Sequence, residues 1–110
     1  MTIRVLLADD NATFVAAVRQ FLSSMTGTDV VGVAHNGRDA MALCESLRPD
    51  LLLLDIGMPE MTGLEAARRM QQWDRPPLIV FLSMHNGQDY RDAARQLGAS
   101  GFISKADFVD

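Results

Sequence analysis

The sequence of 110 residues contains a single cysteine, Cys44. One cysteine excludes an internal disulfide framework and a multi-cysteine metal site. Because Cys44 lies among apolar residues at helical spacing, we expect it to be buried. No apolar run is long enough to span a bilayer, and the chain shows no charged segment followed by an apolar core of the kind that directs secretion. These absences predict a cytoplasmic protein without a membrane partner.

Positive charge is also scarce. Ten Lys and Arg residues stand against fourteen Asp and Glu residues, which gives a net charge of -4. This balance lacks the basic footprint of nucleic-acid binding, so the chain alone is not expected to bind DNA. Its length allows one domain with one core, and an apolar fraction of 48% argues against disorder. We therefore expect residues 1–110 to form a single domain.

Short β-rich runs alternate with segments of helical periodicity. The predicted strands are residues 3–8, 30–34, 51–55, 78–82 and 101–104. The apolar stripes of the predicted helices are Phe14, Val18, Phe21, Leu22 and Met25; Ala40, Leu43, Cys44 and Leu47; and Tyr90, Ala93, Ala94 and Leu97. A further helix is predicted from a capping box at Thr62 and Glu65 to about Gln72. Five such repeats favour an α/β fold with a parallel sheet and helices on both faces.

The end of the chain departs from this pattern. Only five residues follow Lys105, Ala106 to Asp110, where the alternation requires a fifth helix. We therefore predict that the fifth helix is truncated or missing from these 110 residues.

The run Leu51–Leu54 and the aspartate after it are the most informative part of the chain. Four apolar residues between turn signals predict a strand that is buried on both faces. Asp55 then lies at the carboxyl end of the strand, which is the edge where open α/β sheets bind ligands. Asp9 and Asp10 follow the first predicted strand, so three carboxylates are expected to meet at this edge.

Two further side chains, Ser83 and Lys105, follow the fourth and fifth predicted strands. Close carboxylates repel one another unless a cation bridges them, and Mg²⁺ is a hard cation that prefers such oxygen ligands. A carboxylate nucleophile, a metal, a hydroxyl and a lysine are together suited to phosphoryl transfer. Taken singly, each residue has an ordinary explanation: a helix N-cap for the adjacent aspartates, a strand-end serine and a solvated lysine.

The ordered set of motifs resembles the receiver domain of two-component response regulators. The matching segments are residues 7–11 (LADDN), 49–59 (PDLLLLDIGMP), 61–65 (MTGLE), 82–85 (LSMH) and 98–105 (GASGFISK). The resemblance covers essentially the whole chain and implies a flavodoxin-like sheet with strand order 2-1-3-4-5. The wording is most similar to the NarL/FixJ subfamily, whose members usually carry a LuxR-type helix-turn-helix output domain. That relation implies transcription regulation and DNA binding through a domain outside this chain.

The resemblance also implies roles for individual residues. Asp55 would accept the phosphoryl group from a sensor histidine kinase or a small phosphodonor. Mg²⁺ would be held by Asp10, Asp55 and the backbone carbonyl of Gly57, with Asp9 acting largely through water. Ser83 and Lys105 would contact the phosphoryl group. Phosphorylation would promote a homodimer.

Three positions would tune this switch. Phe102 would turn inward when Ser83 moves toward the phosphoryl group. Gly57 and His85 lie two residues past Asp55 and Ser83, and would modulate the lifetime of the phosphoryl group. Many receivers have proline after the lysine, whereas this chain has Ala106, so we expect a trans peptide bond there.

Other functions fit the sequence less well. Haloacid-dehalogenase phosphatases need a second acid two residues after the nucleophile, and Gly57 occupies that position. A nucleotide- or flavin-binding module would need a glycine pattern after the first strand, which is absent. A degenerate receiver that acts only as a protein–protein interaction module remains an alternative. As a receiver, the chain would catalyse only its own phosphorylation and dephosphorylation.

Overall fold

The computed structural model describes residues 2–84 and 88–108. Strands and helices alternate along the chain: β1 (Ile3–Ala8), α1 (Ala12–Ser23), β2 (Thr28–Ala34), α2 (Gly37–Leu47), β3 (Leu51–Asp55), α3 (Gly63–Met70), β4 (Leu78–Ser83), α4 (Gln88–Gln96) and β5 (Gly101–Ser104). All the strand pairs are parallel, and the strand order is β2-β1-β3-β4-β5. The predicted α/β fold and strand order are confirmed.

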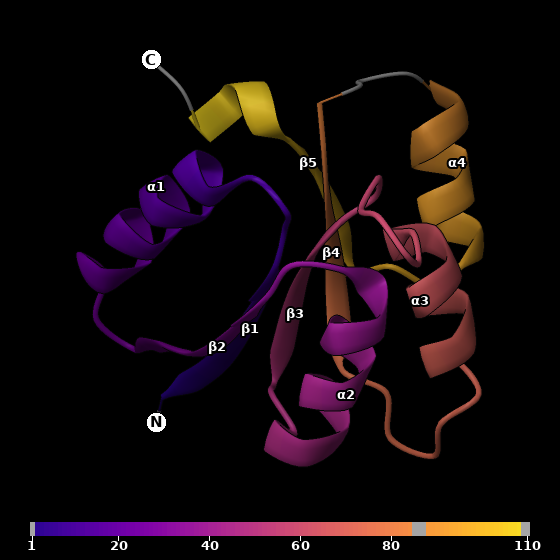
Figure 1. The fold of residues 1–110 in the computed structure, drawn as a ribbon, viewed down its shortest axis with the longest axis horizontal. Coiled ribbons are helices and arrows are strands. Elements are labelled where there is room, and N and C mark those ends of the chain that lie inside the picture. Colours follow the sequence, from indigo (N-terminus) through magenta and orange to yellow (C-terminus); the bar gives the residue numbers. More distant parts are fainter. Residues whose placement is uncertain (1, 85–87, 109–110) are drawn as a thin grey trace.

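Helices cover both faces of the sheet. In Figure 1, α1 lies on one side of the strands, whereas α2, α3 and α4 lie on the other. Successive residues of β3 alternate between these faces, as a pleated strand requires. Leu52 and Leu54 pack in the core that α2 and α3 also supply, and Leu53 packs with Val18 of α1. The strand is therefore buried on both faces, as the apolar run predicts.

Local side-chain contacts explain where the helices begin. The Asn11 side chain accepts a hydrogen bond from the Phe14 backbone N–H at 3.0 Å and caps α1. The Thr62 hydroxyl accepts one from the Glu65 N–H at 3.2 Å and caps α3, as predicted. The Glu65 carboxylate pairs with Arg68 and Arg69 on the exposed face of α3.

Some predicted boundaries and stripes need correction. Strand β2 begins at Thr28 rather than residue 30, and α3 ends at Met70 rather than Gln72. Phe21 and Met25 are exposed, although the helical stripe predicted them inside. Helix α1 ends at Ser23, before Met25, and Phe21 lies on the flank of the helix, because Val15 and Val18 face the sheet. Cys44 is buried as predicted, and burial raises the pKa of its thiol to about 12.

The chain after β5 forms a single 3₁₀ turn over Lys105–Phe108. This short turn stands where the sequence predicts a truncated or missing fifth helix, and the described residues contain four α-helices. The peptide bond between Lys105 and Ala106 is trans, as expected without proline. Within residues 2–84 and 88–108, no helix has the length and apolar character needed to cross a membrane.

Candidate functional site

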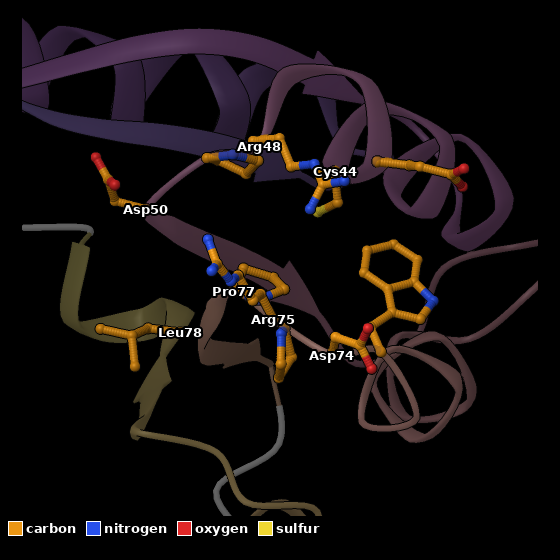
Figure 2. Close-up of a pocket in the computed structure, with 11 residues that line it drawn as sticks. Cys44, Arg48, Asp50, Asp74, Arg75, Pro77 and Leu78 are labelled. Atoms are coloured by element: carbon orange, nitrogen blue, oxygen red, sulfur yellow. The ribbon is translucent and has the colours of Figure 1, made fainter.

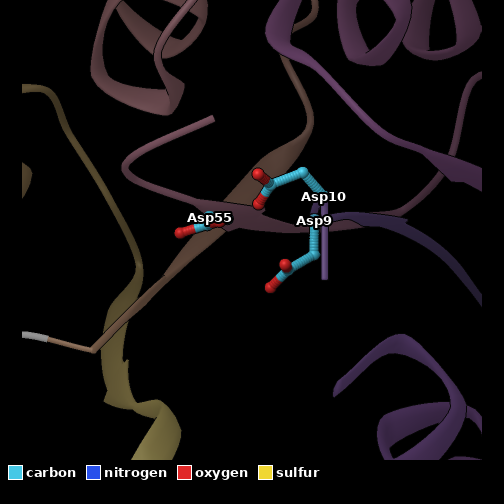
Figure 3. Close-up of side chains that lie close together, drawn as sticks. All are labelled: Asp9, Asp10 and Asp55. Atoms are coloured by element: carbon cyan, nitrogen blue, oxygen red, sulfur yellow. The ribbon is translucent and has the colours of Figure 1, made fainter. Parts of the chain in front are cut away.

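Three carboxylates meet at the carboxyl edge of the sheet. Asp9 and Asp10 directly follow β1, and Asp55 is the last residue of β3. One carboxylate oxygen from each lies within 4.8 Å of the others, and Figure 3 shows the three side chains gathered at the ends of the two strands. Asp9 is fully buried and Asp55 is 7% exposed, whereas Asp10 faces solvent. The predicted convergence of the three acids is thus present.

The backbone fixes the two buried acids at this edge. The Asp9 N–H donates to the Ala34 carbonyl at 2.9 Å, which extends the pairing of β1 and β2 by one residue. The Ile56 N–H donates to the Leu82 carbonyl at 3.0 Å and does the same for β3 and β4. Both carboxylates therefore stand on regular strand ends rather than on loose loops.

Lys105 neutralises part of this negative charge. Its ammonium Nζ lies 2.6 Å from Asp9 Oδ2 and 3.2 Å from Asp55 Oδ2. The side chain is 7% exposed, although it directly follows β5 and could have pointed to solvent. A buried lysine needs such partners, because an unpaired charge is costly in the interior. Lys105 therefore lies buried between Asp9 and Asp55 and is not a solvated strand-end residue.

The Asp9 carboxylate has one oxygen suited to a cation. Its Oδ1 accepts a hydrogen bond from the Asn11 N–H at 2.9 Å. Its Oδ2 is close to Lys105, but this buried oxygen makes no well-aligned hydrogen bond. An ion-paired but poorly satisfied carboxylate oxygen, next to two further carboxylates, matches the hard oxygen ligands that Mg²⁺ prefers. The donor set therefore fits the predicted metal.

Burial and charge shift the protonation of the site in a defined way. Burial raises the pKa of Asp55, and the neighbouring Asp9 carboxylate raises it further, while Lys105 and the Gly57 N–H oppose the change. For Lys105, burial favours the neutral form, but the Asp9 and Asp55 carboxylates outweigh it and raise the pKa above its ordinary value. The ammonium is thus held in its charged form beside Asp55.

The loop after β3 is tied to the rest of the molecule through glycines. The Gly57 N–H donates to Asp55 Oδ1 at 3.3 Å. Gly57 is exposed, and a Cβ added there would meet no atom within 4 Å. Gly63, at the start of α3, donates from its N–H to the Ile56 carbonyl at 2.8 Å. A Cβ at Gly63 would lie 1.9 Å from the Asp55 carbonyl oxygen. Only glycine allows the backbone to approach so closely.

A second close approach joins this loop to α2. The Gly37 N–H donates to the Met61 carbonyl at 3.0 Å, and a Cβ at Gly37 would lie 2.1 Å from the same oxygen. The sequence pattern indicates Gly37 only as a turn or helix start and gives Gly63 no packing role. Both glycines stand at helix N-termini, where glycine has no propensity advantage over the residues that cap helices. Their presence there was the available signal that a close backbone contact requires glycine.

The predicted switch residues lie at the same edge or next to it. Ser83, the last residue of β4, is 2% exposed and pairs in register with Ser104 of β5. Phe102 is half-buried on β5 and packs against the core beneath α4. The guanidinium carbon of Arg91 lies 4.7 Å from the centre of the Phe102 ring, a contact that sequence reasoning missed. His85 lies outside the described residues.

A solvent-open hollow of the described structure lies elsewhere. It has a volume of about 1000 Å³ and is open to solvent at the amino edge of β3 and β4. Figure 2 shows its labelled residues, among them Cys44, Arg48, Asp50, Asp74 and Arg75. The four charged residues named here are exposed. The hollow thus brings together no buried charged groups, and the chemistry of the carboxyl edge is absent from it.

The chain matches the response regulator receiver domain family over residues 5–108. It is 40% identical to a protein-glutamate methylesterase/protein-glutamine glutaminase of Geobacillus kaustophilus over 94% of this chain and 30% of that protein. It is 36% identical to the response regulator UvrY of Escherichia coli over 94% of this chain and 47% of that protein. The chain thus spans less than half the length of these relatives.

Comparison with solved structures also shows similarity to receiver domains. The signal receiver domain of NarL from Mycobacterium tuberculosis superposes with a TM-score of 0.90 at 34% identity, covering 94% of this chain and 84% of that domain. A LuxR-family two-component response regulator from Aurantimonas also reaches a TM-score of 0.90, at 31% identity, covering 96% of this chain and 76% of the other. In fold, in its acidic site and in these similarities, the chain belongs to the receiver domain family of two-component response regulators.

Proposed function

We propose that this chain is a phosphorylation-dependent switch and that Asp55 is its phosphoacceptor. The observation that carries the proposal is the buried Asp55 carboxylate, with the Lys105 ammonium 3.2 Å from its Oδ2 and the Asp9 and Asp10 carboxylates beside it. The phosphodonor would be the phosphohistidine of a sensor histidine kinase or a small acyl phosphate. Membership in the receiver family supports this assignment.

The reaction transfers a phosphoryl group to an Asp55 oxygen, either from the oxygen of an acyl phosphate or from the nitrogen of a phosphohistidine. An Asp55 carboxylate oxygen attacks phosphorus, and the bond from phosphorus to the donor breaks, so that acetyl phosphate releases acetate. Attack requires the ionised carboxylate. Burial favours the protonated form of Asp55, and the adjacent Lys105 ammonium counters that effect. Hydrolysis by water at phosphorus later regenerates Asp55 and releases inorganic phosphate.

Asp9, Asp10, Asp55 and the backbone carbonyl of Gly57 are the proposed ligands of Mg²⁺, Asp9 largely through water. When bound, the metal neutralises negative charge on the phosphoryl oxygens. The protein itself holds the carboxylates in place before phosphoryl transfer. Strand ends hold Asp9 and Asp55, and Lys105 keeps their charges together in a buried site.

The proposed response to phosphorylation begins at Ser83, whose hydroxyl would donate to a phosphoryl oxygen together with Lys105. Phe102 would then turn inward, and this movement would reach α4, because Arg91 of α4 contacts the Phe102 ring. Gly57 is open to solvent and offers no side chain to shield the phosphoryl group. Gly57 and His85 are therefore the proposed modulators of its lifetime.

For the output, we propose a cytoplasmic response regulator that dimerises on phosphorylation and binds DNA through a helix-turn-helix domain outside this chain. Structural similarity to a LuxR-family regulator supports this output. The second candidate is a methylesterase output, because several relatives at 34–40% identity are protein-glutamate methylesterases. The sequence of the complete gene product would distinguish the two.

Intact-mass analysis after incubation with acetyl phosphate and MgCl₂ tests the phosphoacceptor. We expect a labile phosphoryl adduct that disappears in Asp55→Asn and when EDTA removes the metal. Asp50→Asn is the matched control, since Asp50 is an exposed aspartate at the opposite edge of the sheet. If the folded wild-type protein forms no adduct, or Asp55→Asn forms it as well, the phosphoacceptor assignment is wrong and an interaction module without phosphate becomes the better explanation.

A further inference from the structure

We propose that Phe14 is a positioning residue that holds the Lys105 ammonium beside the carboxylates of Asp9 and Asp55, an inference that rests on the proposed function. The Lys105 Nζ lies 4.8 Å from the centre of the Phe14 ring, as well as 2.6 and 3.2 Å from the two carboxylates. The ammonium therefore has an aromatic face as a third neighbour. The ring is half-buried and belongs to α1, on the other side of the strand ends from α4.

The same short segment places both the ring and the Asp9 carboxylate. Asp9 Oδ1 accepts from the Asn11 N–H at 2.9 Å, and Asn11 Oδ1 accepts from the Phe14 N–H at 3.0 Å. The N-cap of α1 is thus bonded to the acid on one side and to the aromatic residue on the other. The backbone of Phe14 is consequently held in place relative to Asp9 through Asn11.

An aromatic ring suits this position because of its charge distribution. The negative face of the ring attracts a cation. Unlike a further carboxylate, it adds no net negative charge next to Asp55, and it is a far weaker acceptor for the three ammonium hydrogens than a carboxylate oxygen. Those hydrogens stay available to the carboxylates and to an incoming phosphoryl group. Leucine would fill much of the same space but would not attract the ammonium.

The composition of the chain makes this contact directly measurable. Lys105 is the only lysine in the sequence, so lysine labelled with ¹³C at Cε gives one methylene signal. We expect that signal to be shifted upfield by the Phe14 ring in the native protein and to return to its ordinary position in urea. Phe14→Leu should abolish the native shift, and Phe14→Tyr should retain it. Phe21→Leu is the matched control, because it removes an exposed ring from the same helix.

The positioning role is tested by the rate of phosphorylation from acetyl phosphate. Phe14→Leu should slow adduct formation about threefold, the scale of one partly exposed cation–π contact, while Phe14→Tyr and Phe21→Leu should match the wild type. An ordinary methylene shift in the wild-type protein would overturn the proposal. So would a Phe14→Leu protein that loses the shift but phosphorylates at the wild-type rate.

The two measurements separate this proposal from the proposed function. If the wild-type protein takes up no phosphoryl group, the phosphoacceptor assignment fails, whereas the methylene shift still decides whether the ring holds the ammonium. If Phe14→Leu does not fold, the comparison of native and urea-unfolded wild type still decides whether a ring lies against Lys105, and an unshifted native signal overturns the proposal.

Discussion

The two edges of the sheet differ in the burial of their charged residues. At the carboxyl edge, Asp9, Asp55 and Lys105 are almost fully buried and lie within ion-pairing distance. At the amino edge, a hollow of about 1000 Å³ is lined by charged residues such as Arg48 and Arg75, all of which are exposed. The size of a hollow therefore does not locate the chemistry of this protein. Buried charges that depend on one another do locate this chemistry. Such an arrangement costs stability and persists only where the surrounding structure holds it in place.

The two edges should also differ in their tolerance of substitution. Surface charges at the amino edge are free to change, since water screens them. The carboxyl edge depends on close backbone contacts and on a balance between two buried carboxylates and one ammonium. Three substitutions probe this contrast, in order of falling effect on stability.

Gly63→Ala should have the largest effect, a loss of about 3 kcal/mol in the free energy of unfolding. The new methyl group would lie 1.9 Å from the Asp55 carbonyl oxygen, so either β3 or the start of α3 must move. Urea denaturation would measure the loss. Gly57→Ala is the control, because its added methyl meets no atom within 4 Å, and it should change stability by less than about 0.5 kcal/mol. Equal stability of the two variants would contradict the close approach at Gly63.

Lys105→Met should destabilise the metal-free protein by about 2 kcal/mol at pH 7, because it leaves two buried carboxylates without their cation. Arg75→Met, at the amino edge, should change stability by about 0.5 kcal/mol or less. While Asp55 is ionised, the contribution of Lys105 is complete below its ordinary pKa of 10.5. Because the fold raises the pKa of Lys105, this contribution is lost as the pH rises through the higher folded value.

Acid conditions sharpen this test. The difference between Lys105→Met and the wild type should shrink as the pH falls through the raised pKa of Asp55, since a protonated Asp55 carboxyl group no longer needs the ammonium. Urea denaturation of both proteins at several pH values would show this trend. A difference that stayed constant with pH would mean that Lys105 contributes through packing of its methylene chain rather than through charge.

Asp55→Asn should stabilise the metal-free protein by about 1 kcal/mol at neutral pH. The pKa of Asp55 is raised, so the folded state binds the proton more tightly than the unfolded state, and the charged form costs stability above the folded pKa. The gain should therefore disappear as the pH falls through that value. Asp50→Asn serves as the amino-edge control: its exposed carboxylate accepts from the Arg4 N–H at 2.8 Å, and an amide oxygen can replace it. Thermal melts at several pH values would measure both variants. Asp55→Asn should raise the stability in a pH-dependent way, and Asp50→Asn should not.

Strand pattern alone was enough to predict a parallel sheet and the residues at its carboxyl edge, whereas the strand order followed from the resemblance to receiver domains. Short apolar runs and turn signals define the five strands, and parallel topology then brings Asp9, Asp55, Ser83 and Lys105 to one edge. The contacts of Phe14 with Lys105 and of Arg91 with Phe102 were not predictable in this way. They depend on how α1 and α4 rotate and pack over the sheet, and an apolar ring or an arginine on a helix carries no signal of its distant neighbour. The exposure of Phe21 was missed for the same reason.

The position of the single tryptophan has a practical consequence for spectroscopy. Trp73 lines the hollow at the amino edge and packs against the core, far from the carboxylates across the length of the strands. Its indole emission therefore reports the integrity of the core and is blind to local events around Asp55. An optical readout of metal or phosphoryl binding needs a fluorophore introduced at the other edge, and the native emission then serves as an internal reference for folding in the same cuvette.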